Sequence, residues 1–139
     1  MLIHSRVLTQ RWVSLPDNDL VKMRTREILS FLTDHPTYQF DSREWLVFLT
    51  VAMEEGVTAP ELVDQLQMPQ QTLSRKIRIL GQTVDEAGEL QGYNLIRIVP
   101  KGKAHSLFLT DQGRALWQAF YAMQDRVDQV IINQFKKQL

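Results

Sequence analysis

The chain has 139 residues, of which 44% are hydrophobic and 23% are charged, a composition typical of one globular domain with a buried core. Lys and Arg together number 16 and so do Asp and Glu, so the net charge gives no indication of a nucleic-acid partner. Cysteine is absent, which excludes disulfides and a thiolate nucleophile.

Membrane and metal sites are not expected either. No apolar run reaches the ~18–20 residues of a membrane span, and residues 1–15 lack the apolar core of a signal peptide. The three histidines, His4, His35 and His105, are scattered without the spacing of metal ligands. We therefore expect a cytoplasmic protein that has no cofactor and does not contact a membrane.

The N-terminal part is expected to form an arm followed by a helix. Residues 3–15 mix β-branched, aromatic and basic side chains before Pro16 and could form a short strand or an arm. Asp17 or Asp19 can cap a helix that runs to about Thr33 and ends before Pro36. Its apolar residues, Leu20, Met23, Ile28, Phe31 and Leu32, follow a helical spacing.

A second helix should begin at Asp41, because Asp41-x-x-Glu44 has the form of a capping box. It continues to Met53 and is apolar on nearly every side, which predicts a position at the centre of the core. Gly56 is expected to be the C′ residue that ends it.

Two short helices follow with only a few residues between them. Thr58 can cap the first, residues 59–66, which has Pro60 in its first turn. Gln67 and Met68 should form a tight turn, and Pro69 should open the second helix at its first position. The second helix runs to about Leu80 before Gly81, with its inward side made by Leu73, Ile77 and Leu80.

The remaining two fifths of the chain are predicted to form a loop, a β-hairpin and a long helix. Residues 82–92 contain two glycines and three acids and read as a loop. Residues 95–99 and 106–109 are strand-like and are joined by a tip at 100–105. Thr110 can cap a last helix of about 28 residues, which would be about 42 Å long.

This order of elements predicts a winged helix-turn-helix, a mainly α fold with a small β-hairpin wing. The second helix of such a unit enters the major groove of double-stranded DNA. Its outward side chains can contact base edges, and Thr72 and Lys76 at its side are expected to contact phosphates. Wing contacts are expected from Lys101 and Lys103, with Arg97 and His105 near the base of the wing. The predicted base-contacting set is Gln70, Gln71, Ser74, Arg75 and Arg78.

Residues 42–118 resemble the MarR family of bacterial transcription regulators, which are dimeric winged-helix proteins. The resemblance is carried by residues 61–66, 71–77, 95–97 and above all 107–116, where Leu-Thr-x-x-Gly-Arg-x-Leu matches the junction between wing and last helix. The sequence departs from the family at Gln67, where a turn glycine is usual, and at Lys76, where an apolar residue is usual. It also has a longer loop at 82–93 and lacks the Asp-x-Arg motif of the wing, which leaves room for a phage or mobile-element regulator.

The resemblance implies a dimer in which the N- and C-terminal helices pair across a two-fold axis. In the last helix, apolar residues spaced 4, 3, 4 and 3 could form a seam for such a pairing, or could pack on the protein's own core. They are Leu116, Phe120, Met123, Val127 and Val130, broadened by Ile131, Ile132 and Phe135. We expect one domain over 1–139, with an arm and dimerisation helix at 1–40, a winged helix-turn-helix at 41–110 and a second dimerisation helix at 111–139.

The predicted function is that of a homodimeric transcription regulator, a repressor at a pseudo-palindromic operator in the bacterial cytoplasm or nucleoid. Many members of the family release DNA when a small aromatic effector binds, and such a pocket could be lined by Trp12, Trp45, Phe48, Trp117 and Tyr121. Two alternatives stay open, a replication or partition protein that binds DNA and a winged-helix adaptor that binds protein. No nucleophile elbow or phosphate-binding glycine loop is present, so an enzyme is not expected.

Overall fold

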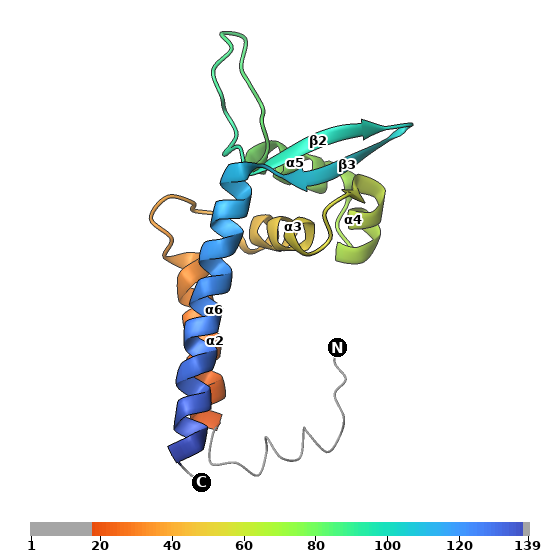
Figure 1. Cartoon of the computed structure of the whole chain (residues 1–139). Helices are drawn as coiled ribbons and strands as arrows, with labels where there is room; N and C mark the ends of the chain where they lie inside the picture. Colours follow the sequence, from red (N-terminus) through yellow and green to blue (C-terminus); the bar gives the residue numbers. More distant parts are fainter. Residues whose placement is uncertain (1–17, 138–139) are drawn as a thin grey trace.

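The computed structural model describes residues 18–137 and consists of a head and a long two-helix arm (Figure 1). The arm is formed by α2 (Asn18–Thr33) and α6 (Asp111–Lys137). The head contains α3 (Ser42–Met53), β1 (Val57–Thr58), α4 (Ala59–Leu66), α5 (Gln70–Leu80), β2 (Ile96–Lys101) and β3 (Ala104–Leu109). Residues 3–15, for which the sequence predicted a short strand or an N-terminal extension, lie outside the described residues and are not part of this two-helix arm. None of the helices within 18–137 is both long and apolar enough to cross a membrane.

Helix α3 begins where the capping box predicted it. The Glu44 amide donates to Asp41 Oδ1 at 2.7 Å, and the Asp41 amide donates to Glu44 Oε1 at 3.1 Å. The helix is central to the core, since Val47, Phe48 and Val51 are fully buried. The expected C′ position of Gly56 is wrong, because the helix already reaches its C-cap two residues earlier, at Glu54.

The helix-turn-helix is built from α4 and α5. Thr58 and Glu61 form a second capping box at the start of α4. At its end Gln67 adopts the left-handed conformation, with φ 51° and ψ 44°, which is the conformation for which a glycine is usual. The Gln67 side chain also donates to the Asp64 carbonyl at 2.7 Å, and this local bond helps a non-glycine residue to hold the turn. Pro69 is the N-cap of α5 and not its first residue, a correction of one position.

The wing is an antiparallel hairpin in a three-stranded sheet of order β1-β3-β2. The hairpin pairs Ile96 with Leu109 at one end and Lys101 with Ala104 at the other. Its tip is therefore only two residues long, Gly102 and Lys103, and not the six residues that the sequence predicted. Pro100 fits into β2 because β2 is an edge strand. The two-residue strand β1 was not predicted.

The junction between β3 and α6 agrees with the sequence prediction. Thr110 Oγ1 accepts a hydrogen bond from the Gly113 amide at 2.9 Å and donates one to the Asn94 carbonyl at 2.6 Å. Gly113 packs against the backbone of Leu95 so closely that a Cβ would clash with the Leu95 carbonyl oxygen. This contact fixes where the arm leaves the head.

In the arm, α2 covers the apolar side of α6. Phe120, Met123 and Val127 are buried, and they pack against residues of α2 that include Ile28 and Phe31. An ion pair between Arg24 Nε and Asp128 Oδ1 at 2.8 Å joins the two helices further along. Leu116 is buried in the core of the head.

Of the five residues that were predicted to form a dimer seam on α6, four are instead buried within the single chain. Leu116, Phe120, Met123 and Val127 are all at most 9% exposed within the single chain, whereas Val130 is 45% exposed. The 4-3-4-3 spacing marks a side of α6 that packs on its own chain.

The loop that connects α5 to the wing projects away from the head (Figure 1) and returns to it at residues 93–95, where Leu95 is fully buried. Val84 and Leu90 form an isolated bridge across this loop. Asp85 Oδ1 accepts from the amides of Ala87 and Glu89, both at 2.9 Å. The loop is thus an ordered turn that carries the three acidic residues of this region.

Candidate nucleic-acid interface

The outward face of α5 carries the five residues that the sequence predicted to contact bases. Leu73, Ile77 and Leu80 are buried and hold the helix on the core. The five predicted residues, Gln70, Gln71, Ser74, Arg75 and Arg78, are all exposed. We call this set the reading face. Its side chains are the types that form hydrogen bonds with base edges in a major groove.

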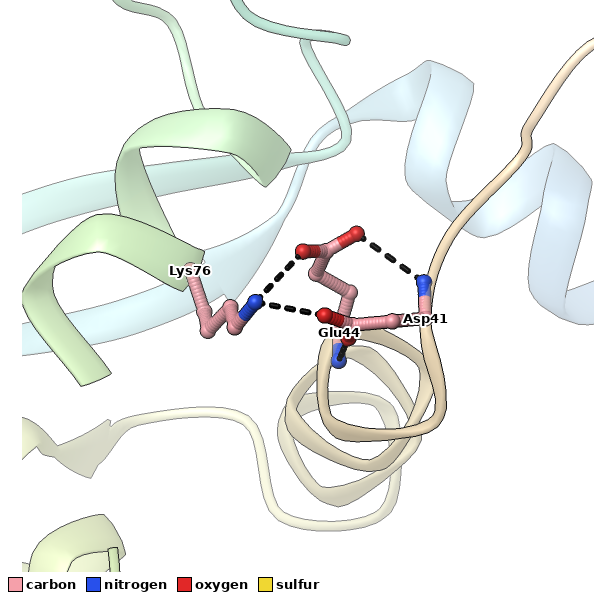
Figure 2. A network of polar contacts seen from close by, with 3 residues as sticks. All are labelled: Asp41, Glu44 and Lys76. Carbon is pink, nitrogen blue, oxygen red and sulfur yellow. Dashed lines mark hydrogen bonds and ion pairs between the residues drawn. The ribbon is translucent and has the colours of Figure 1, made fainter. Parts of the chain in front are cut away.

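Lys76 does not belong to this exposed set. Its Nζ lies 2.6 Å from Asp41 Oδ2 and 2.8 Å from Glu44 Oε2, and its side chain is only 17% exposed (Figure 2). Each carboxylate caps α3 with one oxygen and binds Lys76 with the other. The predicted phosphate contact by Lys76 is therefore corrected: its ammonium joins α5 to the start of α3.

The ion pairs in this cluster shift two pKa values. Partial burial acts to raise the pKa of Asp41, but hydrogen bonds from Lys76 and from the Glu44 backbone outweigh it and hold the pKa below its ordinary value. The hydrogen bonds to Asp41 and then to Glu44 raise the pKa of Lys76. Asp41 and Lys76 are thus both charged near neutral pH, which their ion pair requires.

A groove runs between the first turn of α3 and the side of α5. Its polar lining comes from Asp41, Ser42, Arg43, Thr72, Arg75 and Lys76. We call it the α3–α5 groove. Helical periodicity predicted Thr72 and Arg75 at the interface but missed Arg43, because Arg43 lies almost thirty residues earlier in the chain. Only the packing of α3 on α5 brings it there.

The wing presents its predicted cations on an exposed surface. Lys101 ends β2 and Lys103 lies in the two-residue tip, and both are exposed. His105 is exposed opposite Pro100. The Arg97 guanidinium lies 4.9 Å from the centre of the Phe108 ring, so the ring orients a cation near the base of the wing.

Four of the five aromatic residues that were predicted to line an effector pocket lie in the described part of the chain, and these four do not gather around one cavity. Trp45 and Phe48 are buried in the core of the head, where Trp45 packs against Phe48 with ring centres 6.1 Å apart. Trp117 packs on Phe120, and Tyr121 is 62% exposed. Trp12 lies outside the described residues. Over residues 18–137, no group of three or more His, Cys, Asp or Glu could hold a metal ion.

The head defines a winged helix, and comparison with solved structures identifies the fold as that of MarR-type regulators. A crystal structure of MarR matches with a TM-score of 0.50 and 16% identity, covering 87% of this chain and 84% of that one. A MarR transcriptional regulator from Methanosarcina mazei Go1 matches with a TM-score of 0.53 and 16% identity, covering 96% and 80%. Bordetella bronchiseptica BpsR, a protein whose DNA binding is regulated by 6-hydroxynicotinic acid, matches with a TM-score of 0.50 and 15% identity, covering 90% and 93%.

The fold predicted from the family resemblance is thus confirmed, although the three structures are only 15–16% identical to this chain in sequence. No protein-family model and no curated protein matches the sequence. The three neighbours therefore establish the MarR-like fold of this chain.

Proposed function

We propose that this protein is a transcription regulator that binds specific sequences of double-stranded DNA, as a repressor at a pseudo-palindromic operator. The observation that carries the proposal is the reading face, an exposed polar and basic surface on a helix whose other side is buried. Solved structures with this fold include MarR and a MarR transcriptional regulator, which supports the same function here.

The chemistry of the reading face favours DNA over a protein partner. Arg75 and Arg78 suit guanine and phosphate oxygens, and Gln70 and Gln71 suit adenine. A docking surface for protein would instead be expected to carry a cluster of exposed apolar or aromatic side chains. All five members of the reading face are polar or charged, so the adaptor alternative is the weaker one.

We further propose that the protein binds DNA as a homodimer through the arm. Once α2 and α6 have packed together, large apolar side chains remain exposed on both: Val21, Leu29, Tyr121, Val130 and Ile132 are 44–62% exposed. A second copy would cover them. A two-fold dimer would place two copies of α5 about 34 Å apart, one turn of DNA, which is why a pseudo-palindromic site is expected.

A small aromatic effector is not part of the proposed function. The regulation by 6-hydroxynicotinic acid belongs to the Bordetella bronchiseptica protein. In this chain the described aromatic residues that were expected to line a pocket are packed in the core or exposed on the arm.

The proposal is tested by selecting bound sequences from a random DNA pool with the full chain. An enriched motif with two related half-sites supports it, and no enriched motif would contradict it. Arg75→Ala should relax the preference at one base pair, at a cost of about 1–3 kcal/mol. Lys103→Ala is the matched control, since loss of a phosphate contact should weaken binding to all sequences alike. The positions of the selected sites in a genome, in promoters or in origin-like repeats, separate a repressor from a replication protein.

The dimer is tested separately by sedimentation of the full chain. Leu29→Glu places a charge on the exposed apolar surface of the arm and should produce a monomer with an unchanged fold. Glu86→Lys, a charge reversal at an exposed position outside the arm, in the loop between α5 and β2, is the control. A monomeric wild-type protein would refute the dimer without touching the assignment of the reading face.

A further inference from the structure

The α3–α5 groove contains two cations that have no partner among the described residues. Arg43 comes from the first turn of α3 and Arg75 from the middle of α5, and both are exposed. Over residues 18–137, neither guanidinium takes part in an ion pair. The hydroxyl groups of Ser42 and Thr72 line the same groove, so it offers hydrogen-bond donors together with positive charge.

The acidic groups beside the groove are already occupied by Lys76. Its ammonium lies 2.6 Å from the Asp41 carboxylate and 2.8 Å from the Glu44 carboxylate. Three cations thus face two carboxylates, and the two cations left over are Arg43 and Arg75. An anion that enters the groove meets a net positive charge even though two acids are close by.

The groove and the wing lie on different flanks of α5. Arg78 and Ile98 of the wing line one shared pocket, whereas Thr72, Arg75 and Lys76 line the groove on the other flank of α5. A helix inserted into the major groove has a phosphate backbone on each flank. Arg75 belongs both to the groove and to the reading face, so the two surfaces are continuous.

We propose that the α3–α5 groove binds a backbone phosphate of the same DNA duplex, with Arg43 as the contact that the helix-turn-helix itself does not supply. The inference rests on the proposed DNA binding and adds to it a contact from outside the two helices and the wing. A phosphate contact positions the protein without reading sequence. Arg43 should therefore add affinity and salt dependence but no base preference.

The test is the salt dependence of binding of the full chain to duplexes of about 30 base pairs, nearly three helical turns. One duplex carries a selected site and the other a random sequence. With Arg43→Gln, binding to both should weaken, and the slope of log K against log salt should become shallower by about 0.9. Between 50 mM and 200 mM salt, the wild-type protein should lose about threefold more affinity than this variant. Arg43→Lys keeps the charge and should retain most of the slope.

Two further variants separate this effect from a loss of folding. Lys136→Gln removes an exposed cation from the last turn of α6, away from the groove, and should leave binding unchanged. Asp41→Asn keeps an N-cap acceptor for α3 but removes a negative charge next to the groove, so it should tighten binding. A partly unfolded variant would not bind more tightly.

The results distinguish the two proposals. If the wild-type protein binds neither duplex, the proposed function fails and this inference fails with it. If the wild-type protein binds and Arg43→Gln keeps the wild-type slope, only the inference is refuted. It is also refuted if inorganic phosphate raises the melting temperature in an Arg43-dependent way while the DNA slope stays unchanged, because the groove would then bind a free anion.

Discussion

Replacement of Lys76 by Met tests whether this residue joins α5 to α3 or contacts DNA. Methionine keeps most of the apolar stem and removes only the ammonium. The two carboxylates would then lose a shared counter-ion, and one of them, Glu44, has a side chain that is only 9% exposed. A buried carboxylate without its partner is costly, so the variant should be less stable.

The size of the loss follows from the exposure of the two pairs. A hydrogen bond to a charged group contributes about 1.5–3 kcal/mol, and the sheltered Lys76–Glu44 pair should contribute about 2 kcal/mol. The Asp41 side chain is 51% exposed, so solvent screening reduces its pair with Lys76 to about 0.5 kcal/mol. The expected loss is about 2.5 kcal/mol, a fall in melting temperature of about 5–10 °C for a chain of this size.

The assay is urea unfolding of wild type, Lys76→Met, Glu44→Gln and the double variant at neutral pH. The double-mutant cycle should give a coupling energy of about 1–2 kcal/mol between the two side chains. Arg75→Met is the matched control, since it removes from the same helix an exposed cation that has no ion pair with any described residue, and it should change stability by less than about 0.5 kcal/mol. If Lys76→Met loses no more stability than this control but flattens the salt dependence of DNA binding, the assignment of Lys76 is refuted.

Three further predictions concern the junction between β3 and α6 and the dependence of protein stability on pH below neutrality. Thr110→Ala should lower the free energy of unfolding in urea by about 1–2 kcal/mol, because Thr110 is a buried N-cap. Thr110→Ser should keep most of that free energy, and an equal loss in both variants would contradict a capping role. Gly113→Ala should cost at least about 3 kcal/mol, because the new methyl group would overlap the Leu95 carbonyl oxygen; an unchanged melting temperature would show that the junction is looser than described. Burial lowers the pKa of His35, so the unfolded chain takes up a proton first and stability should fall as the pH drops below about 6.5. A wild-type melting temperature that is flat between about pH 7 and 5, or one that varies there as strongly in His35→Asn, would contradict that reasoning.

The same linkage predicts how the Lys76 cluster responds to pH. The pKa of Asp41 is lowered and that of Lys76 is raised in the folded protein. The stability from this pair is therefore complete above the ordinary pKa of Asp41 and below that of Lys76. It is lost as the pH falls through the lowered value or rises through the raised one.

The sequence alone predicted the elements whose signals are local. The capping box at Asp41 and the caps at Thr58 and Thr110 each involve residues that lie three apart, so their geometry follows from the chain itself. That Glu61 completes a second capping box with Thr58 was not predicted. The buried stripe on α5 and the polar reading face follow from helical periodicity in the same way. Two predicted helix ends were wrong by one position each. Pro69 is the N-cap of α5 and not its first residue, and Gly56 lies one position beyond the C′ residue of α3.

Strand pairing and tip length were predicted less well. The wing tip has two residues and not six, because Lys101 and Ala104 still pair in the ladder. Such pairing depends on register across the hairpin and not on the propensity of either residue. The short strand β1 forms only because Val57 lies opposite Leu107, fifty residues later.

Only the tertiary structure shows which element packs against each side of a helix. Periodicity placed Phe120 and Val127 on one side of α6, but it could not tell whether a second chain or α2 would cover that side. In the same way, the exposed flank of α5 was known to carry Lys76, but only the approach of α3 shows that two carboxylates already hold it. The pattern in a sequence fixes the direction of a side chain relative to its own helix, whereas its partner depends on contacts between residues far apart in the chain. Arg43, which only this packing brings beside Arg75, could be recognised in no other way.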